Sequence, residues 1–162
     1  MDKVMNFSVV LTCVMLFFTL QSSSLLAANL QEYRGEADQY YVEQNYRKAY
    51  KIYFKLAKMG DHYSQGQLAT MYAKGEGKKI DLEEAYAWSM LAAEGRDELL
   101  LKQSDELLLQ VSDQSKAEKK AAKLKKKYGE TALKEKADRR ATRMLNHEMG
   151  GCTGSKLGCA GG

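Results

Sequence analysis

The residues able to support metal, redox or acid–base chemistry are few in this chain. It contains two histidines and three cysteines, and neither His62 nor His147 adjoins a cysteine, so the compact spacings of zinc sites are absent. Adjacent carboxylates such as Glu83-Glu84 diverge on a helix, which predicts solvated faces rather than an acid–base pair. No nucleophile elbow, phosphate-binding loop or H-E-x-x-H motif is present. The sequence therefore predicts a protein that is not an enzyme and that binds no metal or cofactor.

Residues 1–28 differ in composition from the rest of the chain. Lys3 precedes a charge-free run from Val9 to Leu20, and the segment ends in Ala27-Ala28. A bilayer span needs about 20 apolar residues, so this shorter run is typical of a secretory signal peptide that is removed near Ala28. The expected location is the periplasm or the exterior. An inner-membrane protein anchored by residues 9–28 is the alternative.

Export affects how the last two cysteines are interpreted. Cys152 and Cys159 lie in a glycine-rich tail, residues 148–162, and enclose six residues. In an oxidising compartment an even pair at this spacing favours a disulfide over a metal site. Closing so short a loop stabilises a fold by roughly 2–3 kcal/mol. A redox pair is the alternative, although the spacing is not C-x-x-C and the flanking residues are glycines.

The elements that carry these residues are expected to be helices. The chain has no proline and is rich in Ala, Leu, Lys, Glu and Gln, which favour helix. Aligning Ala49-Tyr50 with Ala85-Tyr86 gives an offset of 36 residues, and a period in the mid-thirties is typical of an α-solenoid of stacked helix pairs. The predicted fold class is therefore all-α, with a short solenoid of antiparallel helix pairs.

One segment, residues 60–95, carries a denser pattern of residue types. Its characteristic residues are Gly60-Asp61, Gln65, Leu68, Met71-Tyr72, Gly75, Gly77, Asp81, Ala85, Trp88, Ala92-Ala93 and Gly95. This segment resembles a Sel-one-like repeat, a relative of the tetratricopeptide repeat. The resemblance implies a helix pair there, with a degenerate pair over residues 29–60 before it and basic capping helices over residues 96–147 after it.

Apolar spacing within this segment predicts its core without reference to the family. Leu68 and Tyr72 share one face of a first helix, and Ala85, Trp88 and Ala92 share one face of a second, because positions three, four or seven apart are neighbours on a helix. This spacing places the Trp88 indole between the two helices of the pair. The indole is therefore expected to be structural rather than part of a binding site.

The loop between the two helices has its own signals. Gly75 and Gly77 predict a left-handed or open turn at the end of the first helix, and Asp81 is expected to cap the second. This chain has Lys78 where the family usually has a valine. Ile80 is therefore expected to supply the apolar plug of the loop.

The remaining helices are bounded by breaks in the pattern. Ser112 is expected to cap one of them, and Gly129 is expected to separate the last two. The expected bounds are residues 30–43, 46–58, 113–128 and 130–146, with an amphipathic helix between Gly95 and Ser112.

Charge is distributed unevenly along these helices. Residues 29–112 hold 11 basic and 14 acidic side chains, a net of −3, whereas residues 113–143 hold 12 basic and 5 acidic, a net of +7. The basic helix is either a solvated cap or a contact for an anionic surface, which for an exported protein means lipid, polysaccharide or an acidic protein and not nucleic acid. The lysines expected at such a surface are Lys116, Lys119, Lys120, Lys123, Lys126 and Lys127.

In tetratricopeptide-like stacks the first helix of each pair lines the concave side, so the resemblance implies that partners bind there. The residues expected to contact a partner are Tyr40, Tyr41, Gln44, Gln67, Thr70 and Lys74. The function expected from the resemblance is an exported adaptor or scaffold that binds another envelope or secreted protein. The alternative is a structural envelope component held to an anionic surface by its basic C-terminal helix.

Overall fold

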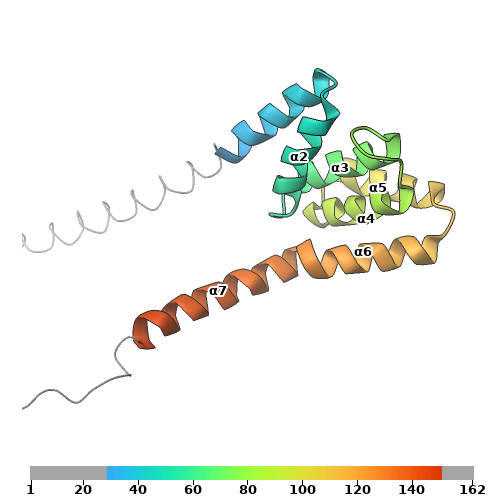
Figure 1. Ribbon diagram of the computed structural model, residues 1–162. Helices are drawn as coiled ribbons and strands as arrows, with labels where there is room; N and C mark the ends of the chain where they lie inside the picture. Colours follow the sequence, from blue (N-terminus) through green and yellow to red (C-terminus); the bar gives the residue numbers. More distant parts are fainter. Residues whose placement is uncertain (1–28, 151–162) are drawn as a thin grey trace, which may run out of the picture.

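The computed structural model describes residues 29–150, with side chains for residues 29–147, and every regular element in this part is a helix (Figure 1). A first helix over residues 29–42 is followed by α2 (Tyr46–Ala57), α3 (His62–Lys74), α4 (Leu82–Ala92), the short 3-10 helix η1 (Ala93–Gly95), α5 (Glu98–Gln110), α6 (Gln114–Tyr128) and α7 (Glu130–Gly150). The all-α prediction is confirmed for these residues. None of the described helices is both long and apolar enough to cross a membrane.

Four helices begin in the same way, with an aspartate as the N-cap. These residues are Asp61, Asp81, Asp97 and Asp113. Each carboxylate accepts a hydrogen bond from a backbone N–H of the first turn, at N···O distances of 2.8 to 3.2 Å, which satisfies donors that a helix leaves unpaired. The expected cap at Asp81 is confirmed. Ser112 is not the cap of α6, because the Asp113 carboxylate makes that hydrogen bond instead.

The turn between α3 and α4 depends on two glycines in the left-handed region. Gly75 has a φ of 78° and Gly77 a φ of 75°, conformations that L-residues rarely adopt. A Cβ on Gly77 would lie 2.7 Å from the carbonyl oxygen of Tyr46. The turn therefore packs directly against the start of α2, as only a glycine allows.

Ile80 does not plug this turn, contrary to the expectation from the sequence. Its side chain is 65% exposed and lies beside Gly75 at the surface. Lys78 contacts the neighbouring aromatic surface instead, with its Nζ 4.7 Å from the centroid of the Tyr50 ring. A lysine can cover apolar surface with its alkyl chain, so the loop needs no isoleucine there.

The core is built around Trp88, which is 1% exposed. Its indole stacks on Tyr128 of α6, with ring centroids 5.8 Å apart, and meets Phe54 of α2 edge to face at 5.9 Å. The ring partners of Trp88 thus come from outside its own helix pair, which the spacing on one helix did not predict. Of the other predicted core residues, Leu68, Ala85 and Ala92 are fully buried and Tyr72 is half-buried.

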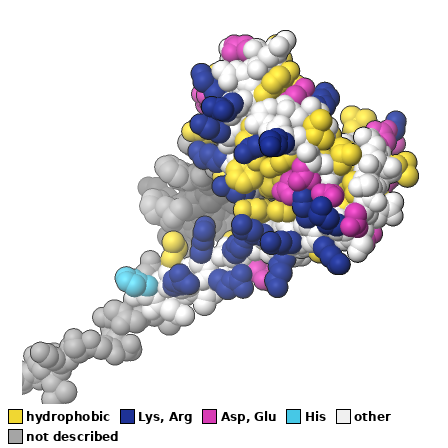
Figure 2. All heavy atoms as spheres, turned by 45° about the vertical axis from the view of Figure 1, so that its right-hand side comes forward, with side chains coloured by type: hydrophobic (Ala, Val, Ile, Leu, Met, Phe, Trp, Pro, Cys, Tyr) yellow, Lys and Arg dark blue, Asp and Glu magenta, His cyan; other side chains and the backbone are white. Residues whose placement is uncertain are grey.

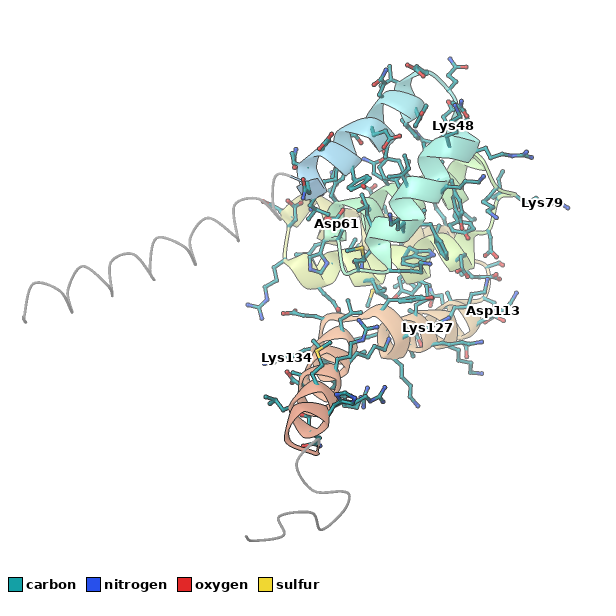
Figure 3. All side chains as sticks on the ribbon, turned by 60° about the vertical axis from the view of Figure 1, so that its left-hand side comes forward. Lys48, Asp61, Lys79, Asp113, Lys127 and Lys134 are labelled. Atoms are coloured by element: carbon teal, nitrogen blue, oxygen red, sulfur yellow. The ribbon has the colours of Figure 1, made fainter. Side chains whose placement is uncertain are left out.

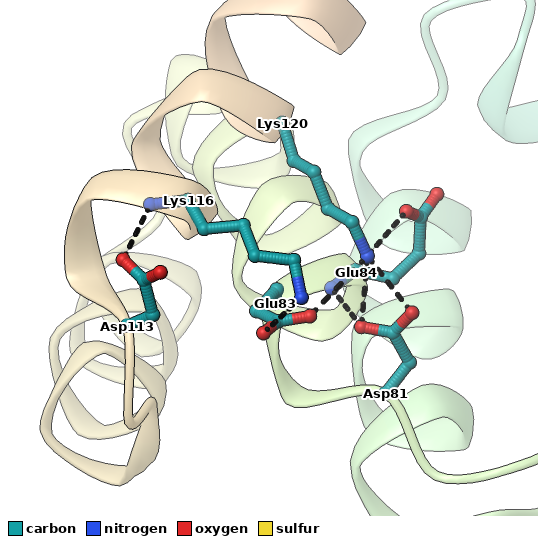
Figure 4. A network of polar contacts seen from close by, with 6 residues as sticks. All are labelled: Asp81, Glu83, Glu84, Asp113, Lys116 and Lys120. Carbon is teal, nitrogen blue, oxygen red and sulfur yellow. Dashed lines mark hydrogen bonds and ion pairs between the residues drawn. The ribbon is translucent and has the colours of Figure 1, made fainter.

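The basic helix α6 contributes to this core and is more than a cap. Ala117 and Ala121 are buried where α6 packs on α4. Beside them, Lys120 Nζ lies 2.8 Å from Asp81 Oδ2 and 3.5 Å from carboxylate oxygens of both Glu83 and Glu84 (Figure 4). Burial alone would raise the pKa of Asp81, but hydrogen bonds from Lys120 and a backbone N–H hold this pKa below its ordinary value.

Replacing Lys120 with methionine should destabilise the fold by about 1–2 kcal/mol, because three clustered carboxylates lose their shared cation. Lys119→Met is the matched control, since Lys119 is exposed and should change the free energy of unfolding by less than about 0.5 kcal/mol. Urea denaturation of both variants measures the difference. Adding 1 M salt should shrink it, because salt screens ion pairs; equal stability of the two variants would contradict the role of this network.

The helices pack in sequence order along the body. α2 packs on α3, α3 on α4, and α4 on both α5 and α6. α7 continues beyond α6 and extends away from this body (Figure 1). Residues 138–147 of α7 are exposed throughout.

Candidate functional site

A groove of about 530 Å³ lies between α3 and α5. Its lining comes from both helices and from the turn around η1. The lining residues are His62, Tyr63, Gly66, Gln67, Thr70, Gly95, Asp97, Leu99, Leu100 and Gln103. No lysine or arginine lines the groove, and Asp97 is its only carboxylate. The groove is thus mainly uncharged, with amide, hydroxyl and apolar side chains.

Two contacts hold α3 and α5 beside each other along this groove. Gly66 has no side chain, and a Cβ there would lie 2.6 Å from Leu100 Cδ2 of α5, so the glycine permits the close approach of the helices. Gln103 Nε2 donates to Thr70 Oγ1 at 2.8 Å and to the Gly66 carbonyl at 3.3 Å. These contacts place Gln103 opposite α3 and define the floor of the groove.

Two ionisable side chains of the groove, Asp97 and His62, form hydrogen bonds with residues close to them in the chain. The Asp97 carboxylate accepts hydrogen bonds from the N–H groups of Leu99 and Leu100, at 2.9 and 3.2 Å. His62 Nδ1 lies 3.2 Å from the amide oxygen of Gln65. Neither group faces an acid–base partner across the groove. Both groups are therefore held by hydrogen bonds within the protein.

Part of the predicted partner-binding set lies in this groove. Gln67 and Thr70 line it, whereas Lys74 is exposed at the end of α3 and does not. The Thr70 hydroxyl donates to the Gly66 carbonyl at 3.2 Å and accepts from Gln103. Thr70 thus positions α5, and Gln67 is the predicted residue that is left to meet a partner.

The other predicted partner-binding residues lie apart from the groove. The Tyr41 hydroxyl donates to Glu76 Oε2 at 2.6 Å, and burial together with this hydrogen bond raises the pKa of Tyr41. Lys48 Nζ lies 4.8 Å from the centroid of the Tyr40 ring. Gln44 has a φ of 59° in the turn before α2. Tyr40 and Tyr41 thus make their contacts within the protein, whereas the Gln44 side chain is exposed.

Most residues of the groove are absent from the predicted partner-binding set, among them Tyr63, Leu99 and Gln103. The signal that could have found two of them is the offset of 36 residues, which superposes Gln67 on Gln103 and Tyr63 on Leu99. The same offset relates the N-caps Asp61 and Asp97. The offset thus extends into residues 96–147, which the resemblance assigns to capping helices.

The predicted anionic-surface lysines fall into two groups. Lys116 Nζ lies 2.9 Å from Glu83 Oε1, and Lys120 belongs to the network with Asp81, so these two lysines serve the α4–α6 interface instead of an external surface. The other four are exposed, and none forms an ion pair with a carboxylate of residues 29–147. They are Lys119, Lys123, Lys126 and Lys127.

Comparisons of the chain with protein-family models, with curated proteins and with solved structures find no match. The predicted disulfide of Cys152 and Cys159 and the predicted signal peptide over residues 1–28 lie outside the described residues. Within those described, no group of three or more His, Cys, Asp or Glu side chains is arranged to hold a metal ion.

Proposed function

We propose that the protein is an exported adaptor that binds a segment of another protein in the groove between α3 and α5. The observation that carries this proposal is the lining of the groove: Gln67 and Gln103 lie along it, and Leu99 is 77% exposed at its edge. The Gln67 amide can both donate to and accept from a peptide backbone. The Gln103 N–H groups are bonded to Thr70 and Gly66, so its amide oxygen is the group that can accept, and the exposed leucine offers an apolar contact. The expected partner segment is uncharged where it enters the groove.

The arrangement of the helices supports a short α-solenoid related to the Sel-one-like repeat. Ala49, Ala85 and Ala121 recur at intervals of 36 residues on α2, α4 and α6, and all three are buried. Recurrence of a small buried residue at one interval indicates equivalent packing of successive pairs. In this proposal α3 and α4 form one pair, α5 and α6 each pack on α4, and the groove lies between α3 and α5.

A charge placed in the groove should weaken partner binding. We expect the full chain with a photo-crosslinking residue at Gln67 to capture a discrete protein from its native envelope. Leu99→Asp should reduce this capture roughly tenfold, because a carboxylate would be buried against an apolar contact without a partner. Quantitative mass spectrometry of the crosslinked product measures the change.

Leu109→Asp is the matched control for this experiment. Leu109 lies on the same helix and is 84% exposed, but it does not line the groove. The control should capture the partner as well as the unmodified chain does. Equal capture by the Leu99 and Leu109 variants would contradict binding in this groove.

The proposal includes export, which the composition of residues 1–28 supports. Amino-terminal sequencing of the protein recovered from its cells should begin at or near Asn29. Asn29 is the first residue of the first described helix, so cleavage there would leave the helical body intact. Recovery of a membrane-embedded form starting at Met1 as the only species would contradict export by cleavage.

The alternative function is an envelope component held to an anionic surface by the basic helix. Fewer lysines are available for such a surface than the sequence indicates. Two of its six lysines, Lys116 and Lys120, have carboxylate partners within the protein. The ion pairs reduce the positive potential that an external anion would meet. We therefore favour the adaptor over the surface-bound component.

A further inference from the structure

A second hollow, of about 360 Å³, lies between the α2–α3 turn and the junction of α6 with α7. Its lining is mostly apolar: Met59 is 65% exposed beside it, and Leu133 reaches the turn, where a Cβ on Gly60 would lie 2.8 Å from Leu133 Cδ1. The lining residues are Met59, Gly60, His62, Tyr128, Glu130, Leu133, Lys134 and Ala137. None of them lies in α5. His62, at the start of α3, is the one lining residue that this hollow shares with the groove.

Lysines from three helices surround the hollow. Lys134 of α7 lines it, and Lys127 of α6 and Lys136 of α7 lie over the Tyr128 ring, with Nζ 5.0 and 5.8 Å from its centroid. Figure 3 shows Lys127 and Lys134 on the two helices that meet there. None of these three lysines forms an ion pair with a carboxylate of residues 29–147.

A fourth lysine approaches from α2. Lys58 Nζ lies 4.7 Å from the centroid of Phe54, and Phe54 and Tyr128 both pack on Trp88. Lys58 likewise has no carboxylate partner among the described side chains. On the face seen in Figure 2, basic side chains lie on both sides of a band of apolar ones. A lysine over an aromatic ring is only weakly stabilised at an exposed site, so these cations remain available to an external anion. Lys136 also donates one hydrogen bond to the Lys127 carbonyl.

We propose that this hollow docks an acidic amphipathic segment of a partner protein. Four lysines and the carboxylate of Glu130 give a net charge of +3 at the hollow. A second carboxylate beside it, Glu94, accepts a hydrogen bond from the Glu130 N–H and is paired with Lys125 at 2.9 Å. Charge of one sign around an apolar surface is complementary to a segment with carboxylates at its edges and apolar side chains at its centre. Met59, Leu133 and Ala137 supply the apolar contact, and the lysines supply the charge.

The shape of the site favours a protein segment over a membrane. Lys134 lines the concave surface, and Lys127 and Lys136 lie over Tyr128 of the same lining. Lys58, just after α2, lies over Phe54, which packs on Trp88 as Tyr128 does. A concave surface fits a segment of a protein better than it fits a flat bilayer. Lys116 and Lys120, which would extend a flat basic face along α6, are paired with acidic residues of α4. A discrete segment can reach all four lysines at once.

The test uses the full chain and a fluorescent peptide, EELLEELLEELL, as the probe, with binding measured by fluorescence anisotropy. Lys58→Glu/Lys127→Glu/Lys134→Glu should weaken binding by about tenfold or more, because charge reversal replaces attraction by repulsion. Lys51→Glu/Lys79→Glu/Arg140→Glu makes the same change of charge at exposed positions away from the hollow and should weaken binding less than about threefold. Thermal melting of both variants verifies folding.

Further arms separate apolar docking from general attraction of charges. The peptide EEQQEEQQEEQQ keeps the charge and lacks the leucines, so it should bind about tenfold more weakly. Met59→Glu, a single change in the lining, should also weaken binding of the leucine peptide. The proposal is overturned if the leucine peptide does not bind, if both triple variants lose binding equally, or if only phosphatidylglycerol vesicles distinguish them. These variants leave the α3–α5 groove unchanged, so the two binding sites can fail independently.

Discussion

Replacing Trp88 with alanine should lower the free energy of unfolding by about 3–5 kcal/mol, the usual cost of truncating a buried tryptophan. The indole of α4 joins three helices, because it packs on Phe54 of α2 and on Tyr128 of α6. α2 precedes α4 in the chain and α6 follows it. For a domain of this size the loss corresponds to a fall in the thermal midpoint of roughly 10–20 °C. Circular dichroism during heating measures the change.

Two further variants test whether aromatic packing is the cause. Trp88→Phe keeps a ring and removes the indole Nε1–H, which is buried without a hydrogen-bond partner among the described residues, so it should cost only about 1–2 kcal/mol. Met90→Ala changes a partly exposed residue of the same helix and should cost less than about 1 kcal/mol. An unchanged melting curve for Trp88→Ala would show that the three helices do not depend on the indole.

Replacing Asp61 with alanine should destabilise the fold by about 2–4 kcal/mol, because one buried carboxylate has two roles. It caps α3 by accepting from the Ser64 N–H at 3.0 Å and from the Ser64 hydroxyl at 2.5 Å. It also pairs with Arg34 of the first helix, and its side chain is almost fully buried there. Asp97→Ala is the matched control, since this exposed N-cap of α5 makes no ion pair within residues 29–147 and should cost about 1 kcal/mol.

The stability difference between the unmodified chain and Asp61→Ala should depend on pH. Burial alone would raise the pKa of Asp61, but hydrogen bonds from Arg34 and Ser64 hold this pKa below the ordinary value of 3.8. A lowered carboxyl pKa stabilises the fold above the unfolded-state pKa and ceases to do so as the pH falls through the folded-state pKa. Urea titrations should therefore find the full difference at neutral pH and a smaller one in acid. A difference that does not change with pH would assign the effect to capping alone.

The bounds of the helices could be predicted from the sequence to within a few residues, because their signals are local. Aspartates that cap helices and glycines such as Gly75, which ends α3 with a positive φ, act on the backbone within one turn. The wrong prediction that Ser112 caps α6 also has a local cause. Aspartate is as favourable an N-cap residue as serine, and the neighbouring Asp113 makes the hydrogen bond. The burial of Ala85 and Trp88 also followed from spacing on a single helix.

The sequence by itself determined that this chain forms amphipathic helices and which face of α4 is apolar, since both depend on residues within a few positions of each other. Only the tertiary structure decided what those faces meet: Trp88 packs on Phe54 and Tyr128, and Lys120 pairs with Asp81. The candidate groove depends equally on the docking of α5 against α3, where Gln103 lies opposite Gly66. Contacts between residues more than 30 positions apart depend on how whole helices pack, and a pattern read along one helix does not specify its neighbour.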